Sequence, residues 1–289
     1  MHLERKLEEG HFAVLAEMEP PKGCDPSKLV SDSRRVKGEV DAFVLPEMSN
    51  AVMRMSALGA AMILQSNGME TVMQVCCRDR NRLALQADLL AASACGIKNV
   101  MAVAGEDPSF GDHHQAKAVY DIDLPDMLQA LQTLQSGRDM AGIELSGKPS
   151  FLVGAGINAA AQGSALDLEL EEMHSKIEAG VRFFISPPVF DLHAIDSFLK
   201  KVDPRSIHLI PTVLLLKSLG MARYINIHMD HIHIPDPLIA RIQKASDKVG
   251  ECVAIARETV TALKENGFSG VLLSTLGWEN RLPDILQTS

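Results

Sequence analysis

Short segments in which nearly every residue is apolar recur along the chain, about every 36 residues if its 289 residues are divided by eight. A polar or glycine-containing break follows each segment, and then a stretch with helical spacing of apolar residues. Continuous apolarity is typical of parallel strands that helices cover on both faces. The predicted strands span Phe12–Met18, Asp41–Leu45, Thr71–Cys77, Asn99–Ala104, Phe151–Ala155, Arg182–Ser186, Ile207–Val213 and Val271–Ser274.

Helical patterns lie between these strands. Asn81–Ala94 places four leucines on one broad apolar face, and Gly96 is expected to end that helix. Leu166–Ala179 repeats the pattern and stops at Gly180. Strands that alternate with helices predict an α/β fold, a single (β/α)8 TIM barrel formed by residues 1–289. A doubly wound open sheet is the alternative, but the turn after the first strand reads EMEPPKGCD and contains no GxGxxG.

Charge and cysteine content narrow the function classes. A net charge of −9 argues against a nucleic-acid partner, which requires clustered basic residues. The apolar run Val213–Leu216 stops at Lys217, far short of the ~20 residues of a membrane span, so no membrane partner is expected. The five cysteines are an odd number, as expected for reduced thiols rather than a disulfide framework. The first residues, MHLERKLEEG, lack an apolar signal core, and we therefore expect a cytoplasmic protein.

In a (β/α)8 barrel the chemistry lies at the carboxyl ends of the strands and in the loops that follow them. Glu17 and Glu19 occupy this position on the first strand, on the same side of the chain, with Met18 opposite. Burial in a partly dry mouth raises the pKa of a carboxyl group, so either residue could act as a general acid. Alternatively, one of them caps or pairs with Lys22. The other strand-end residues are Pro46, Glu47, Cys77, Arg78, Asp79, Gly105, Glu106, Asp107, Asn158, Ser186, Pro187, Pro211, Thr212, Ser274 and Thr275.

The segment Arg78–Arg82 is rich in arginine. Asp79 resembles an N-cap, which would start the helix near Arg80. Arginines at the start of a helix oppose its dipole. This predicts either an anionic partner such as a phosphate or pairing with carboxylates of neighbouring loops.

A run of histidines near the end of the seventh repeat resembles a set of metal ligands. His231 and His233 would share one face of an extended segment, and zinc binds imidazoles in such positions. No cysteine lies nearby, and we expect a surface connection and no metal.

Taken together, the strand-end motifs resemble the methylenetetrahydrofolate reductase family over nearly the whole chain. The resemblance implies a flavin-binding (β/α)8 barrel that carries FAD and uses NAD(P)H to reduce 5,10-methylenetetrahydrofolate to 5-methyltetrahydrofolate. Barrels of this kind often associate, so a homo-oligomer is expected. The motifs are Glu17–Pro21 (EMEPP), Cys77–Asn81 (CRDRN), Gly96–Gly105 (GIKNVMAVAG), the GDH that begins at Gly111, Val119–Asp123 (VYDID), Lys176–Gly180 (KIEAG) and Pro188–Asp191 (PVFD).

The resemblance also assigns roles to single residues. Glu17 resembles the general acid that protonates the folate ring nitrogen as the five-membered ring opens, and Glu106 is a second catalytic candidate. Glu169 and Lys176, two turns apart on one helix, would hold the ribityl or diphosphate part of the cofactor. The implied cofactor-binding set is Pro46, Gln74, Ala104, Gly105, Glu106, Tyr120, Asp121, Asn158, Glu169 and Lys176, and the implied substrate-binding set is Pro187, Leu219 and Trp278.

Some positions depart from the family pattern. Glu106 replaces an aspartate, and Pro46 and Pro187 replace residues with hydrogen-bonding side chains, while proline also lacks a backbone N–H. Trp278 could stack on a pterin or p-aminobenzoyl ring. These departures keep two alternatives open: a diverged flavin-binding or inactive subunit of a larger complex with a partner protein, and a flavin-free pterin-binding methyltransferase that works with a corrinoid protein.

Overall fold

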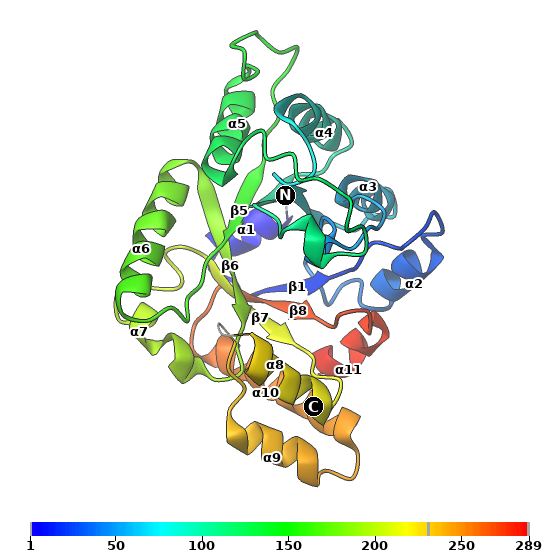
Figure 1. Ribbon diagram of the computed structural model, residues 1–289, viewed down its shortest axis with the longest axis vertical. Helices are drawn as coiled ribbons and strands as arrows, with labels where there is room; N and C mark the ends of the chain where they lie inside the picture. Colours follow the sequence, from blue (N-terminus) through cyan, green and yellow to red (C-terminus); the bar gives the residue numbers. More distant parts are fainter. Residues whose placement is uncertain (1, 230–231, 288–289) are drawn as a thin grey trace.

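Eight parallel strands pair in sequence order and close on themselves, because β8 also pairs with β1. The structure is a computed structural model and describes residues 2–229 and 232–287. The predicted (β/α)8 barrel is confirmed, and each predicted strand overlaps one observed strand with ends that differ by at most two residues. The strands are β1 (Ala13–Glu17), β2 (Ala42–Leu45), β3 (Thr71–Cys76), β4 (Asn99–Val103), β5 (Leu152–Gly156), β6 (Val181–Pro188), β7 (Leu209–Leu214) and β8 (Gly270–Ser274) (Figure 1).

Helices surround the sheet on its outer side (Figure 1). Within the described ranges, none of them is both long enough and apolar enough to cross a bilayer. The α-helices are α1 (His2–Glu8), α2 (Ser27–Arg35), α3 (Ala57–Ser66), α4 (Arg82–Ala94), α5 (Leu124–Ser136), α6 (Gly163–Glu178), α7 (Asp196–Leu199), α8 (Leu219–His228), α9 (Asp236–Lys244), α10 (Lys248–Glu265) and α11 (Leu282–Leu286). Short 3-10 helices are η1 (Ser49–Ala51), η2 (Pro108–Phe110), η3 (Leu192–Ile195) and η4 (Glu279–Arg281).

The start of α4 differs from its prediction. Asn81 is the N-cap, because its side-chain oxygen accepts the N–H of Ala84 at 3.1 Å. The prediction that Asp79 caps this helix is wrong, because both carboxylate oxygens of Asp79 accept hydrogen bonds from Arg78. The helix therefore begins at Arg82.

Side chains alternate along each strand between the barrel interior and the layer beneath the helices. On β1, Ala13 and Leu15 belong to the inner apolar core, whereas Met18 just beyond the strand belongs to the outer one. Phe183 on β6 is fully buried inside the barrel. Its ring occupies the space beside Gly154 on β5, where a Cβ atom would lie 2.2 Å from the ring.

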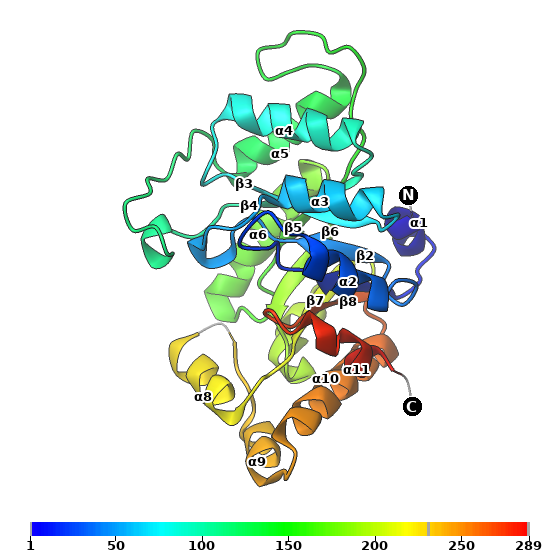
Figure 2. The ribbon, with the colours of Figure 1, turned by 90° about the vertical axis from the view of Figure 1, so that its right-hand side faces the viewer.

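Helix α1 closes the amino-terminal end of the barrel. Its Leu3 and Leu7 are part of the inner apolar core. Glu70 accepts the N–H of Leu3 at 3.1 Å, and Lys6 forms an ion pair with Asp41 at 2.7 Å. Figure 2 shows α1 on the opposite side of the barrel from α8. The end of the barrel formed by the carboxyl ends of the strands is therefore the one available for a functional site.

Substitution of Gly154 tests the packing of the interior. We expect Gly154→Ala to destabilise the protein by about 1–3 kcal/mol, because the new methyl group overlaps the Phe183 ring. Gly156→Ala is the matched control, since nothing lies within 4 Å of a Cβ atom at that position. Urea unfolding of both variants measures the difference, and equal stability would show that the interior is not packed in this way.

Candidate active site at the barrel mouth

Glu17 is the last residue of β1, and its alternation with Leu15 directs its side chain toward the barrel mouth. Ser274 at the end of β8 donates a hydrogen bond from Oγ to Glu17 Oε1 at 2.8 Å. Burial raises the pKa of Glu17, and the nearby negative charges of Glu19 and Glu279 raise it further, whereas the Ser274 hydrogen bond lowers it. The sum is a raised pKa, so the carboxyl group holds its proton at a higher pH than an ordinary glutamate does.

Gln74 and Gly156 lie at the same end of the barrel, on β3 and β5. The side-chain oxygen of Gln74 accepts the N–H of Glu47 at 3.3 Å, and its amide nitrogen lies 3.9 Å from the sulfur of Met101. Both are weak contacts for an amide, which leaves Gln74 with hydrogen-bonding capacity for a ligand. Gly156 leaves open space where a side chain would project.

The turn after β4 contains Ala104, Gly105 and Glu106. Gly105 has a φ of +87°, and a Cβ atom there would lie 2.4 Å from the sulfur of Cys76, so the turn requires glycine. The hydroxyl of Tyr120 donates to the carbonyl oxygen of Gly105 at 3.1 Å. The structure thus joins Tyr120 to this turn, and it leaves Ala104 and Glu106 exposed.

Asp121 has a different environment from its neighbour Tyr120. Its carboxylate accepts hydrogen bonds from the side chain and the backbone N–H of Arg82, at 2.8 and 2.9 Å. These bonds lower the pKa of Asp121. Asp121 therefore fixes the loop at the start of α4.

Asn158, Glu169 and Lys176 come together beside the end of β5. The N–H of Asn158 donates to Glu169 Oε1 at 2.8 Å. Lys176 Nζ donates to the carbonyl of Gly156 at 3.2 Å and pairs with Glu172 at the same distance. Glu169 and Lys176, which the spacing of seven residues places on one face of α6, thus both contact the segment at the end of β5.

The proline and aromatic candidates occupy distinct places. Pro46 is buried directly after β2. Pro187 lies inside β6 rather than after it, and the β6–β7 register shifts at this residue because proline cannot donate to the ladder. Leu219 is the first residue of α8. The ring of Trp278 faces the ammonium group of Lys217, whose Nζ atom lies 5.3 Å from the ring centroid.

The arginines of Arg78–Arg82 all pair with carboxylates. Arg78 pairs with Asp79, Arg80 with Glu47 and Asp88, and Arg82 with Asp121, at 2.7 to 3.0 Å. Of the two alternatives, the structure therefore shows pairing with neighbouring loops. Glu47 is 4% exposed, and burial raises the pKa of its carboxyl group.

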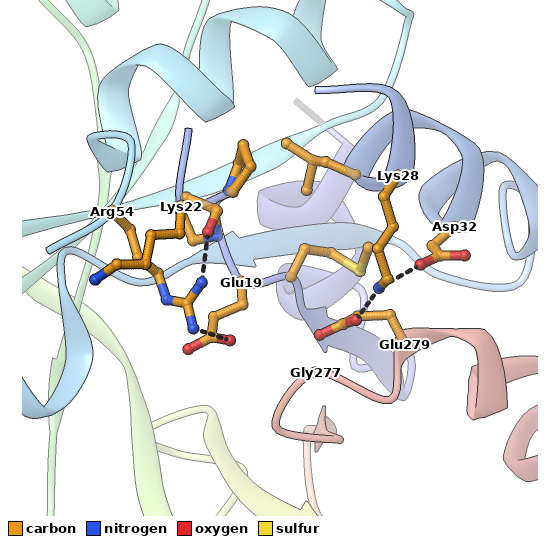
Figure 3. Close-up of a pocket in the computed structure, with 11 residues that line it drawn as sticks. Glu19, Lys22, Lys28, Asp32, Arg54, Gly277 and Glu279 are labelled. Atoms are coloured by element: carbon orange, nitrogen blue, oxygen red, sulfur yellow. Dashed lines mark hydrogen bonds and ion pairs between the residues drawn. The ribbon is translucent and has the colours of Figure 1, made fainter. Parts of the chain in front are cut away.

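A cavity of about 310 Å³ lies beside the mouth, between α2 and the loops after β1 and β8 (Figure 3). Glu19 lines it and pairs with Arg54 at 2.9 Å. The prediction that Glu17 or Glu19 pairs with Lys22 is wrong, because Lys22 instead pairs with Asp112. The remaining lining residues are Met18, Pro20, Pro21, Lys22, Lys28, Leu29, Asp32, Gly277 and Glu279.

Two residues near Glu17 were not assigned a role from the sequence. Ser274 was noted only as a strand-end residue, and its position at the end of β8 is the signal that could have identified it. Glu279 is 5% exposed and pairs with Lys28 at 2.7 Å. No sequence pattern indicates that it approaches Glu17, which lies more than 250 residues away in the chain.

The histidine segment does not show a metal site where it is described. His228 stacks against Tyr224 with ring centroids 4.4 Å apart. Residues 230 and 231, and with them one predicted ligand, lie outside the described residues. Among residues 2–229 and 232–287, no three His, Cys, Asp or Glu residues are grouped to hold a metal ion.

A family model described as methylenetetrahydrofolate reductase matches residues 2–289. The chain belongs to the methylenetetrahydrofolate reductase family. This confirms the resemblance stated above and indicates a folate-related function. A search of curated protein sequences gave no significant match.

Several solved structures have the same fold as this chain, although their sequences are only distantly similar to it. A protein from Clostridium thermocellum, described as binding two copies of 5-methyl-5,6,7,8-tetrahydrofolic acid, has a TM-score of 0.65 at 14% identity, over 98% of this chain and 96% of that one. EDTA monooxygenase (EmoA) from Chelativorans sp. BNC1 has a TM-score of 0.58 at 9% identity, over 95% and 92%. A 2,3-dimethylmalate lyase has a TM-score of 0.51 at 11% identity, over 94% and 76%. At these identities the similarity shows the fold alone.

The raised pKa of Glu17 predicts how the thermal stability of the protein depends on pH. Below about pH 4 this carboxyl group is neutral in both the folded and the unfolded chain, and as the pH rises the unfolded chain ionises first, so the wild type loses stability. Glu17→Gln removes this loss, and its Tm relative to the wild type should therefore rise as the pH increases above about pH 4. Scanning calorimetry measures this trend. Glu19→Gln removes one of the nearby charges that raise this pKa, so it should show only part of this gain, and a flat difference for Glu17→Gln would contradict the raised pKa.

Proposed function

We propose that this protein reduces 5,10-methylenetetrahydrofolate to 5-methyltetrahydrofolate, with NAD(P)H as the electron donor and FAD as the cofactor. The observation that carries the proposal is the Glu17 carboxyl group at the mouth of a barrel of this family, whose pKa burial raises and whose Oε1 atom accepts a hydrogen bond from Ser274. A reduction that opens a ring at nitrogen requires a proton donor beside the reacting atoms. We propose that Glu17 is that donor.

The residues around the mouth fit a flavin. Gly156 offers open space, Gln74 has an amide with spare hydrogen-bonding capacity, and Tyr120 orders the turn at Gly105. We propose that these residues contact the ring system, together with Pro46, Ala104 and Glu106. The sugar and phosphate parts would lie near Asn158, Glu169 and Lys176, where Lys176 supplies the positive charge. When bound, FAD would supply hydride transfer, which no amino-acid side chain provides.

Glu17 and Ser274 divide the task of proton transfer. Ser274 donates to Oε1, so a transferable proton on Glu17 would reside on Oε2. The charges of Glu19 and Glu279 disfavour early loss of this proton. The carboxyl group would therefore hold its proton more strongly than an ordinary glutamate until a basic nitrogen is bound beside it. Glu106, exposed on the turn after β4, and the substrate-binding candidates Pro187, Leu219 and Trp278 would orient the folate.

Two comparisons support a folate as the substrate. The match to the family model spans residues 2–289, and a solved structure with the same fold is described as binding 5-methyl-5,6,7,8-tetrahydrofolic acid. Trp278, next to the Lys217 ammonium, offers an aromatic face for a pterin or p-aminobenzoyl ring. We further propose that the chain acts as a single domain, and its five free thiols fit the reducing cytoplasm.

A second candidate is a flavin-carrying subunit of a larger complex. The observation that favours it is the exposure of large apolar side chains on η2 and α8, with Phe110 78%, Tyr224 61% and Ile227 70% exposed. Exposed apolar groups of this size often contact another protein. Such a surface would serve either a protein partner or a second copy of the chain in a homo-oligomer.

The spectrum of the isolated protein, followed by rapid mixing, tests the proposal. We expect flavin absorbance that bleaches with NAD(P)H and returns when 5,10-methylenetetrahydrofolate is added. Reduction without reoxidation by the folate would favour the subunit, and folate binding without flavin would favour the methyltransferase. Glu17→Gln should keep the NAD(P)H step and lose about 10²–10⁴-fold in the folate step. Glu8→Gln, which breaks only an exposed ion pair with Arg182 at the opposite end of the barrel, should keep both steps. Full folate turnover by Glu17→Gln would refute the proton-donor role.

Ser274→Ala tests how the pKa of Glu17 is set. The Ser274 hydrogen bond lowers this pKa, so its removal should raise it further. The rate of the folate step falls as Glu17 ionises, and the variant should therefore retain its rate to a higher pH than the wild type. Thr275→Val is the matched control, because Thr275 Oγ1 has no hydrogen-bond partner among the described residues. Identical pH profiles for Ser274→Ala and the wild type would contradict the contact.

A further inference from the structure

Arg78 is a buried arginine in the loop between β3 and α4, beside the barrel mouth. It is 2% exposed, and burying a guanidinium costs free energy unless its N–H groups find acceptors. Its Nε and Nη2 atoms donate to the two carboxylate oxygens of Asp79, both at 2.7 Å. This bidentate pair satisfies only part of the guanidinium.

The other donors of Arg78 reach two neighbouring loops. Nη1 donates to the carbonyl of Glu106, after β4, and Nη2 to the carbonyl of Met48, after β2, both at 3.3 Å. The carbonyl of Arg78 itself accepts the N–H of Val119 at 2.8 Å. One residue of the β3–α4 loop therefore contacts the loop after β2 and both ends of the segment 106–119.

The backbone that Arg78 contacts is in conformations that need support. Met48 has a φ of +49°, which is strained for a residue with a side chain and persists only where the surroundings fix it. Gly105 packs on Arg78, since a Cβ atom there would lie 2.9 Å from Arg78 Cβ. Tyr120 donates a hydrogen bond to the carbonyl of Gly105, and Arg78 donates one to the carbonyl of Glu106. These two bonds set the orientation of successive peptide groups in the turn.

We propose that Arg78 is a positioning residue that holds the loops after β2 and β4 in the conformation that binds the cofactor. A peptide group whose carbonyl is held also has its N–H directed, because the trans peptide is planar. The guanidinium thus fixes which backbone groups face a ligand at the mouth. The nature of that ligand, FAD, rests on the proposed function, whereas the ordering of the loops does not.

The role is distinguishable from a general contribution to stability. A buried ion pair adds little net stability, so its removal should affect the contacted loops before the barrel. Arg78→Lys keeps the charge and a contact with Asp79, but a single ammonium lacks the planar fork that reaches Met48 and Glu106 as well. Arg78→Met removes all these contacts while keeping a long apolar stem.

Hydrogen exchange by mass spectrometry on the full chain, with and without FAD, tests the proposal. Both Arg78 variants should exchange at least about tenfold faster in residues 46–54 and 105–120, with unchanged exchange in α1 and β8, and the Kd for FAD should rise by about 10–100-fold. Arg241→Met is the matched control, because Arg241 on α9 forms similar pairs with Glu251 and Glu258 away from the mouth. It should alter neither quantity.

The outcomes separate this role from the proposed function. Unchanged exchange in both segments of Arg78→Lys would overturn the positioning role, whatever the affinity for FAD. If Arg78→Met does not fold, Arg78→Lys alone decides by the same criterion. Faster loop exchange in a protein whose wild type binds no FAD would refute the proposed function and leave the positioning role standing.

Discussion

The pairing of β8 with β1 is the constraint on which the site depends. It closes the sheet, so that the ends of strands far apart in the chain meet around one opening. Glu17 and Ser274 are hydrogen-bonded only because their strands are neighbours in the closed barrel. Helix α1 fills the opposite end with Leu3 and Leu7, which gives the barrel one usable opening. An open sheet with the same helices would leave these two residues at opposite edges.

The opening combines a carboxyl group of raised pKa with loops joined by ion pairs. Near Glu17, negative neighbours and burial favour the protonated carboxyl group. A short distance around the rim, arginines and carboxylates pair instead and join the loops after β2, β3 and β4. Carboxylates at the mouth thus have two roles: Glu17 is a candidate acid, whereas Glu47 and Asp121 join loops through ion pairs. The extent of burial and the nearest charged neighbour determine which role a carboxylate has.

The fold was predictable because its signal is local. Each strand is a continuous apolar run, and a helix pattern separates it from the next, so the barrel follows from the order of the elements. Glu17 was also predictable, since the end of a strand places its last inward residue at the mouth. Gln74 was identified through the family resemblance. Asn158, Glu169 and Lys176 were identified through the family resemblance, and the structure brings them together.

Other features depend on contacts that the sequence does not encode locally. Asp79 and Asn81 are both good N-caps, and the choice depends on which one Arg78 engages. Lys22 pairs with Asp112 and Glu19 pairs with Arg54, and the loops that carry these residues come together only in the closed barrel. Pro187 was expected after the strand, but the shifted register on β7 lets β6 continue through it.

The Phe183 ring that covers Gly154 limits how deep the mouth can be. A molecule entering between the strand ends meets this ring one layer below Gly156 and cannot follow the barrel axis further. A flat ligand of the kind proposed above would then rest across the opening, with one face toward the protein. Its outer face would stay accessible, which suits a cofactor that meets two different reactants in turn at a single surface.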